Sequence, residues 1–340
     1  MENTGDPTAG KRKADHIELA MQSAVDAGMI DRRFRYEPIL AGHPDSSTDL
    51  SVKFLGKRMQ APIWVSSMTG GTDHARHINH HLARVCGEYG LGMGLGSCRM
   101  LLESEERFPD FDVRDLIGDH LPLYANLGIA QVEQMIENGH VRQIEALVDR
   151  LRADGLIIHV NPLQEWLQPE GDRISRPPIE TIKRLIDASP LKIIVKEVGQ
   201  GMGPESLLAL LKLPLAAIEL AAHGGTNFAR LEMLRSSESF ARTYEPLARV
   251  GHDVYEMTGF INALWTEKGQ QIECREIIIS GGVKTFLDGY YLVNKLNLNG
   301  VYGQASTFLK HARGDYDELS SFVQAQIEGL KIARAYLRVI

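Results

Sequence analysis

From residue 61 onward the chain alternates between short apolar runs and amphipathic helical stretches, and this alternation constrains the fold more than any other feature. The runs are rich in β-branched residues and end in Gly, Ser, Asn or Thr. We expect eight strands, at residues 62–68, 91–96, 122–127, 156–160, 192–198, 216–221, 276–280 and 300–303. Eight strand–helix alternations in roughly 250 residues predict a closed parallel (β/α)8 TIM barrel. A doubly wound open sheet is the alternative, but its usual GxGxxG turn is absent here.

Amphipathic helices are expected between the strands. In 141–152 the apolar residues recur at one face of a helix, and Gly155 follows as a stop signal. The same pattern predicts a helix over 17–27 that ends at Gly28, and another over 255–267. The remaining helices are expected at residues 75–89, 178–188, 204–211, 286–296 and 316–337.

The chain is expected to form one domain over residues 11–340 behind a disordered tail, 1–10. Within it, 11–60 would be an N-terminal arm and cap, and 236–270 an inserted helical segment. A net charge of −7 argues against a general affinity for nucleic acid or acidic membranes. No leader peptide or membrane span is expected, and the three cysteines fit no zinc pattern, so we expect reduced thiols and a cytoplasmic protein.

Polar residues follow each expected strand, and in a barrel these carboxyl ends share one pocket. The stretch from His159 to Glu165 is the richest, because an apolar run leads directly into His, Asn, Gln and Glu. Such groups are costly to bury without partners, so this stretch is either a solvated loop or a ligand-binding strand end. The other polar strand ends contribute Ser67, Thr69, Ser97, Asn126, Lys196 and Thr226.

Two Gly-containing loops, Gly281-Gly282 and Gly303-Gln304-Ala305, follow the seventh and eighth strands, where barrels commonly bind phosphate. Lys196 could hold negative charge on a reduced flavin, or it could pair with a neighbouring carboxylate. The basic run Lys11 to Lys13 is either a solvated charge run or an anion-binding arm.

Six motifs in order resemble the type 2 isopentenyl-diphosphate δ-isomerases, which are FMN-dependent barrel enzymes. The resemblance covers residues 11 to about 310. The motifs are Arg12-Lys13-x-Asp15-His16-Ile17, Met68-Thr69-Gly70-Gly71, Ala125-Asn126-Leu127-Gly128, His159-x-Asn161-Pro162-Leu163-Gln164-Glu165, Lys196-Glu197-Val198-Gly199 and Gly224-Gly225-Thr226-Asn227.

The resemblance implies a role for each matching residue. Gln164, His159 and Asn161 would be the catalytic residues, with Gln164 beside the isoprenyl carbons, and Glu165 would hold Mg²⁺. The diphosphate substrate would be bound by Arg12, Lys13, His16, Ser97, Arg99 and Gln164. FMN would be bound by Ser67, Met68, Thr69, Ser97, Asn126, Lys196, Thr226, Gly281, Gly282, Gln304 and Ala305.

The implied reaction interconverts isopentenyl diphosphate and dimethylallyl diphosphate in isoprenoid biosynthesis. The substrate is an alkene without an acidic C–H bond, so a proton must be added at one carbon and removed from the next. Reduced FMN, with NADPH as reductant, would supply the proton and stabilise nearby positive charge, and Mg²⁺ would bridge to the diphosphate. A homo-oligomer, either a tetramer or an octamer, is expected.

The sequence departs from the family pattern in two places. Where the family usually carries Trp-Gly-x-Pro-Thr after the sixth strand, residues 244–253 differ, and His223 is unusual. His223 raises an alternative, an FMN-dependent 2-hydroxy-acid oxidase or dehydrogenase on the same barrel, whose His-Gly-Gly-Arg run pairs a base with a carboxylate anchor. Thr226 occupies the Arg position here, which weighs against that alternative. A third possibility is a flavin- or phosphate-binding protein without catalysis, which would not need Gln164 and Glu165 together with Arg12 and Lys13.

Overall fold

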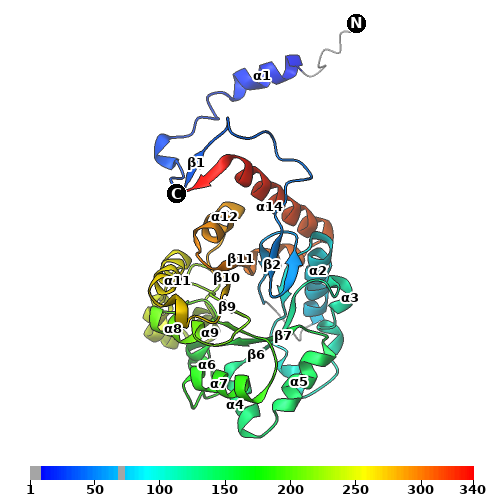
Figure 1. The fold of residues 1–340 in the computed structure, drawn as a ribbon, viewed down its shortest axis with the longest axis vertical. Coiled ribbons are helices and arrows are strands. Elements are labelled where there is room, and N and C mark those ends of the chain that lie inside the picture. Colours follow the sequence, from blue (N-terminus) through cyan, green and yellow to red (C-terminus); the bar gives the residue numbers. More distant parts are fainter. Residues whose placement is uncertain (1–8, 68–72) are drawn as a thin grey trace.

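The computed structural model describes residues 9–67 and 73–340, and these contain a closed barrel of eight parallel strands (Figure 1). The predicted fold class and all eight predicted strands are confirmed. In chain order the barrel strands are β4 (Ile63–Val65), β5 (Gly92–Gly94), β6 (Leu123–Gly128), β7 (Gly155–His159), β8 (Ile193–Lys196), β9 (Ala217–Glu219), β10 (Glu276–Ser280) and β11 (Asn299–Gln304).

Successive residues of each barrel strand point alternately into two apolar clusters. Outward residues such as Val195 join the large core between the barrel and its helices, whereas the neighbouring Ile194 joins a separate cluster inside the barrel. This follows from the two-residue period of a strand. The inner cluster, here named the apolar plug, comprises Trp64, Tyr124, Ile157, Ile194, Ala217, Ile278 and Val301.

Two residues beyond the apolar plug, the inward positions become polar. This layer, here named the polar floor, comprises Ser66, Asn126, His159, Lys196, Glu219 and Ser280. Strand β5 adds no side chain at this level, since a Cβ on Gly94 would lie 2.6 Å from Cδ1 of Ile157 and 2.9 Å from Oγ of Ser67. The barrel interior is therefore apolar towards the amino ends of the strands and polar at their carboxyl ends.

The amino end of the barrel is closed by a short hairpin of β2 (Val52–Phe54) and β3 (Lys57–Met59). Phe54 and Met59 are fully buried against the apolar plug. The backbone N–H of Leu55 donates to Glu276 Oε2, at the first residue of β10, with an N···O distance of 2.6 Å. The part of 11–60 nearest the barrel thus covers the end opposite the polar floor.

Helices surround the strands, and the predicted helices between strands are confirmed with ends shifted by up to two residues. They are α2 (Asp73–Tyr89), α5 (Val141–Arg150), α7 (Pro178–Ala188), α8 (Pro204–Leu211), α12 (Phe286–Lys295) and α14 (Tyr316–Tyr336). Helices without a specific prediction are α3 (Arg114–Ile117), α4 (Ile129–Glu137), α6 (Pro162–Leu167), α9 (Phe228–Arg235), α10 (Glu238–Tyr244) and α13 (Ser306–Ala312).

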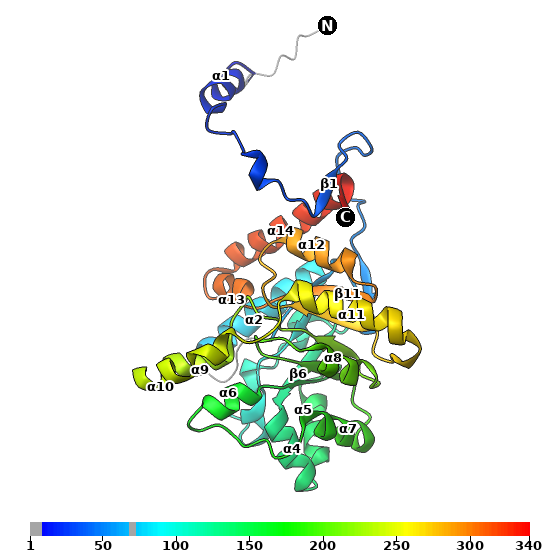
Figure 2. The ribbon, with the colours of Figure 1, turned by 90° about the vertical axis from the view of Figure 1, so that its left-hand side faces the viewer.

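The segment 236–270 is largely helical, and its two halves are placed differently. Its second half is α11 (Val254–Lys268), which packs against α8, α12 and β10 and so occupies the place of a barrel helix. Asp253 starts α11 with a capping box to Glu256. The excursion from the barrel is therefore α9, α10 and the 3-10 turn Glu245–Arg249, which project to one side in Figure 2.

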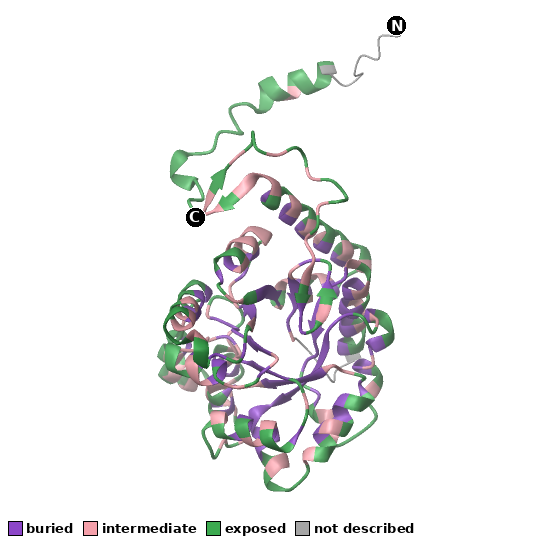
Figure 3. Ribbon diagram, viewed as in Figure 1, coloured by how far each residue is buried: buried purple, intermediate pink, exposed green. Residues whose placement is uncertain are grey.

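The N-terminal helix differs from the prediction. The structure has α1 at Ala9–Leu19 and no helix over 20–26, so the expected helix over 17–27 is wrong beyond Leu19, and part of the expected tail is helical. The described residues offer no surface that buries these apolar positions, because Ile17 is 81% and Met21 90% exposed. Figures 1 and 3 show α1 as an exposed arm beyond the antiparallel pair β1 (Phe34–Tyr36) and β12 (Leu337–Val339).

Across residues 9–67 and 73–340, none of the helices combines the length and the apolar character that a membrane crossing requires.

Candidate active site

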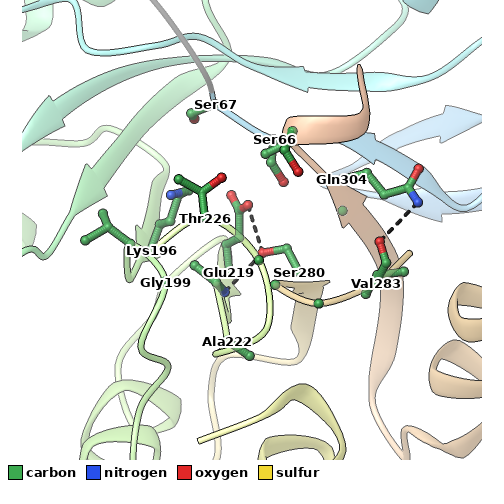
Figure 4. Close-up of a pocket in the computed structure, with 18 of the residues that line it drawn as sticks. Ser66, Ser67, Lys196, Gly199, Glu219, Ala222, Thr226, Ser280, Val283 and Gln304 are labelled. Carbon is green, nitrogen blue, oxygen red and sulfur yellow. Dashed lines mark hydrogen bonds between the residues drawn. The ribbon is translucent and has the colours of Figure 1, made fainter. Parts of the chain in front are cut away.

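A cavity lies above one side of the polar floor, at the carboxyl ends of β4 and β8 to β11 (Figure 4). It encloses about 610 Å³ of empty space, its open mouth included. Seven of the predicted cofactor residues line it together, namely Ser67, Lys196, Thr226, Gly281, Gly282, Gln304 and Ala305. The predicted Met68 and Thr69 lie outside the described residues.

Several polar atoms of this cavity have no partner within the described protein. Oγ of Ser66, Oγ of Ser67 and Oε2 of Glu219 are all buried without a hydrogen bond. Leaving buried polar atoms unpaired costs free energy, so native structures rarely do so without a ligand or water. The cavity therefore offers the hydroxyl groups of Ser66 and Ser67 and one carboxylate oxygen of Glu219 to a polar ligand.

Lys196 provides the positive charge of the cavity. Its side chain is buried and donates from Nζ to the carbonyl oxygen of Glu197 at 3.0 Å. The Glu197 carboxylate turns away, because its Oε2 accepts from the backbone N–H groups of Gly199, Gln200 and Gly201. Burial raises the pKa of Glu197, although those three hydrogen bonds oppose the shift. Lys196 forms no ion pair with a carboxylate among the described residues.

The glycine pairs at the rim allow close approach of backbone. Gly281 has φ +89°, and a Cβ there would lie 2.1 Å from the N atom of Ala222. Gly282 in turn faces Gly224, with 3.2 Å between its Cα and a Cβ placed on Gly224. Glycine is therefore required at these positions partly because the loop after β9 and the loop after β10 pack closely against each other. The side chain of Gln304 points away from the cavity to the carbonyl oxygen of Val283, so Gln304 lines the cavity mainly through its backbone.

On the other side of the polar floor, His159 and Asn126 fix each other. Asn126 Nδ2 donates to the carbonyl oxygen of Leu95 at 2.9 Å, so its Oδ1 must accept, and His159 Nδ1 donates to it at 2.8 Å. Burial, and secondarily the charge of Lys196, lowers the pKa of His159 to about 3. The neutral imidazole therefore keeps its proton on Nδ1 and its lone pair on Nε2.

Beyond β7, Asn161 precedes α6 and Pro162 starts it, where the missing N–H of proline costs nothing. Leu167 anchors α6 against Ala229 and Met233 of the excursion. This docking brings Gln164 to Glu232, with 3.2 Å between Gln164 Nε2 and Glu232 Oε1.

Asn161 connects the two polar residues of α6. Its Nδ2 donates to Oε1 of Gln164 at 3.1 Å and to Oε1 of Glu165 at 2.9 Å. A continuous chain of hydrogen bonds thus runs from Glu165 through Asn161 and Gln164 to Glu232. Both ends of the chain are buried carboxylates.

Arg99, which is expected to bind the diphosphate, lies beside this chain of hydrogen bonds. Its Nη1 pairs with Asp172 Oδ2 at 2.7 Å, and the backbone N–H of Asp172 donates to Oε2 of Glu165 at 2.8 Å. Ser97 is exposed two residues earlier in the chain. A cation and a carboxylate therefore stand together at the open side of the site.

The predicted basic residues of the arm are not near these groups. Arg12, Lys13 and His16 lie exposed on α1, which stands clear of the barrel (Figures 1 and 2). The described structure thus brings together the strand-end residues of the prediction but leaves its three arm residues apart.

Metal binding would have to rely on few protein ligands. Within the described residues no three His, Cys, Asp or Glu side chains converge on one point. Glu165 is nonetheless a buried carboxylate, and its two oxygens accept hydrogen bonds from Asn161 Nδ2 and from the backbone N–H of Asp172. A single carboxylate suits Mg²⁺, which keeps several waters and binds through one or two carboxylates plus substrate phosphates.

His223 does not face the cavity. Its Nε2 lies 3.1 Å from the carbonyl oxygen of Ala248, in the excursion, and His223 is not among the residues that line the cavity. A catalytic base must reach the proton that it removes. The position of His223 therefore gives no support to the oxidase alternative.

Three residues of the site were not predicted from the sequence: Ser66, Glu219 and Glu232. Ser66 and Glu219 could have been found by extending the inward period of β4 and β9 by two residues. Glu232 had no such signal, because its position depends on how α9 docks against α6.

Comparison with known proteins decides the family. No family model matches the chain. The isopentenyl-diphosphate delta-isomerase of Synechococcus sp. is 36% identical over 329 residues, which cover 95% of this chain and 91% of that protein. The enzyme of the same name from Rickettsia felis is 35% identical over 327 residues, with 95% and 91% covered.

The chain belongs to the isopentenyl-diphosphate delta-isomerase family. Solved structures of other proteins have a similar barrel. Flavocytochrome b2 with sulfite bound gives a TM-score of 0.60 at 15% identity, over 89% of this chain and 72% of that one. A mandelate oxidase with an FMN adduct gives 0.53 at 11% identity, over 91% and 88%. At such identities the likeness concerns the fold alone, so the isomerase family rests on the sequence relatives.

Proposed function

We propose that this protein interconverts isopentenyl diphosphate and dimethylallyl diphosphate, with reduced FMN in the cavity and Mg²⁺ beside Glu165. The single observation that carries the proposal is the match to named isomerases over 95% of the chain. The geometry agrees with it in two ways. The unpaired side-chain oxygens of Ser66, Ser67 and Glu219 call for a polar ligand in the cavity. The ammonium group of Lys196 is suited to bind the edge of a flavin ring that carries negative charge.

FMN, when bound, supplies a reduced ring that can give and take a proton beside the alkene. The protein's part is orientation and exclusion of water. The apolar plug excludes water from the amino-terminal side of the ring. The side-chain amide of Gln164 is held in one orientation by hydrogen bonds to Asn161 and Glu232, and this orientation would place it against the reacting carbons. His159 is neutral, so it adds no positive charge near a carbocation-like transition state.

The diphosphate would lie at the open side, near Ser97 and Arg99. Glu165 would hold Mg²⁺ there, with the other positions filled by water and diphosphate oxygens. Arg12, Lys13 and His16 would join only if the arm moves or comes from a second copy of the chain. A homo-oligomer and NADPH as the reductant remain predictions, to be checked by molecular mass in solution and by anaerobic reduction.

The test is an anaerobic assay with isopentenyl diphosphate, Mg²⁺ and FMN reduced by dithionite. We expect dimethylallyl diphosphate only when the flavin is reduced and Mg²⁺ is present. Equal product with oxidised FMN, or none with reduced FMN fully bound, would contradict the proposal. Bleaching of oxidised enzyme by a 2-hydroxy acid would favour the oxidase alternative.

A further inference from the structure

Glu219 is a buried carboxylate whose environment the barrel itself does not explain. It is 0% exposed, and its Oε1 accepts one hydrogen bond, from Ser280 Oγ at 3.0 Å. Its Oε2 has no partner among the described residues and lines the cavity. Because an isolated buried charge is costly, a carboxylate held in this way needs a ligand or a nearby charge to offset the cost.

The nearby charge is Lys196. The two residues face each other in the register of β8 and β9, and both point into the cavity in Figure 4. They form no direct ion pair, since Lys196 Nζ donates instead to the carbonyl oxygen of Glu197. Among the described residues that line the cavity, Lys196 and Glu219 are the two with ionisable side chains, so the lining carries one positive and one negative group.

Other charged groups near this pair do not change that balance. His159, the register partner of Lys196 on β7, is neutral because burial, and secondarily the charge of Lys196, lowers its pKa. Glu197 directs its carboxylate to the backbone of 199–201. Ser280, from β10, and Ser66, after β4, are uncharged.

We propose that Glu219 is a positioning residue whose negative charge offsets Lys196 and sets how readily the bound reduced flavin loses a proton. This inference rests on the proposed function, because it assumes that the flavin ring lies over the polar floor. A lysine alone would favour the deprotonated, anionic ring, whereas the carboxylate disfavours it. The chemistry requires a flavin ring that both holds a proton and releases it. Because the charges of Lys196 and Glu219 cancel, the protonated and the anionic form of the reduced ring both stay accessible.

The proposal makes Glu219→Gln informative, because glutamine has nearly the same shape without the charge. In the anaerobic FMN-bound enzyme, reduced by dithionite, the absorbance of the flavin is followed from pH 5 to 9 to obtain its acid dissociation constant. An opposite or like charge within contact range shifts such a constant by about tenfold or more. We expect Glu219→Gln to make the reduced flavin a stronger acid by about tenfold, and Glu219→Asp, which keeps the charge, to stay within about threefold of wild type.

A matched control is Glu276→Gln, a half-buried carboxylate at the opposite end of β10, which should leave the constant unchanged. The second measurement is thermal melting without flavin. If the Oε2 charge is unpaired, Glu219→Gln should raise the melting temperature of the apo-protein by roughly 1–3 °C.

Each outcome is decisive. An unchanged acid constant with FMN bound overturns the inference, and a variant that fails to fold or melts lower means that Glu219 is a structural residue instead. Failure of the wild-type protein to bind FMN is a different result and would contradict the proposed function, which the wild-type titration shows separately.

Discussion

The barrel mouth and the N-terminal arm carry the two groups of predicted site residues, and they differ in how those residues are held. At the mouth, Asn161 and Glu165 are buried and fixed by hydrogen bonds to their neighbours. On the arm, Arg12 and Lys13 are exposed on a helix whose apolar residues Ile17 and Leu19 also face solvent.

The difference suggests separate tasks. Groups that are oriented before the substrate arrives can stabilise a transition state without further ordering. Groups on a free-standing arm must be ordered on binding, so their contribution goes mainly to holding the ligand. We therefore expect substitutions at the mouth to lower kcat and substitutions on the arm to raise KM.

The largest effect is expected for Gln164→Ala. Loss of one preorganised polar group at a reacting centre typically costs about 10²- to 10³-fold in kcat. Steady-state kinetics with saturating FMN would measure it, and unchanged FMN absorbance would show that the cavity is intact. The control is Gln168→Ala, at the end of α6, which should stay within about twofold of wild type. A drop confined to KM would assign Gln164 to binding and weaken the comparison.

Glu165→Gln is expected to act on the metal. Loss of a charged contact costs about 1.5–3 kcal/mol, so the Mg²⁺ concentration for half-maximal activity should rise by roughly tenfold or more while FMN stays bound. Activity titrated against MgCl₂ measures this. Glu170→Gln, an exposed glutamate paired with Arg235, serves as the control. An identical Mg²⁺ titration for the Glu165 variant would remove it as a ligand.

On the arm, Arg12→Ala and Lys13→Ala should each raise KM by roughly 10- to 150-fold, with kcat changed less than threefold. Arg32→Ala, another exposed charge of the arm, provides the control for net charge alone. Unchanged KM in both variants would mean that the run from Lys11 to Lys13 is only a solvated charge run, and that the mouth binds the diphosphate by itself.

The smallest effect concerns stability at acidic pH. The pKa of His159 is about 3 in the folded protein and about 6.5 when unfolded, so between these values only the unfolded chain binds the proton. Stability from this residue is therefore complete above pH 6.5 and decreases as the pH falls towards 3. Since His159 is partly exposed, we expect a loss of about 1–2 kcal/mol from pH 7 to 5.

His159→Gln should remove that part of the pH dependence in chemical unfolding experiments, whereas the exposed His140→Gln should not. Parallel curves for wild type and His159→Gln over pH 5–7 would show that His159 titrates normally in the folded protein.

The barrel and most of the mouth could be predicted because both follow from local patterns. Strand periodicity decides that Asn126, His159 and Lys196 share one face, and parallel strands bring their ends together. Glu219, the register partner of Lys196, obeys the same rule. Two features could not be predicted in this way. Glu232 reaches Gln164 only through the docking of α9 on α6, and the apolar residues of α1 are not buried by any part of the chain that the structure describes.

The most direct test of the account is solvent isotope exchange during turnover. The anaerobic enzyme with reduced FMN, Mg²⁺ and isopentenyl diphosphate is incubated in D₂O, and both diphosphates are analysed by mass spectrometry. We predict deuterium in dimethylallyl diphosphate and in recovered isopentenyl diphosphate, with the flavin still fully reduced at the end. Unlabelled diphosphates together with net oxidation of the flavin would contradict an isomerase in which a proton is added and another removed.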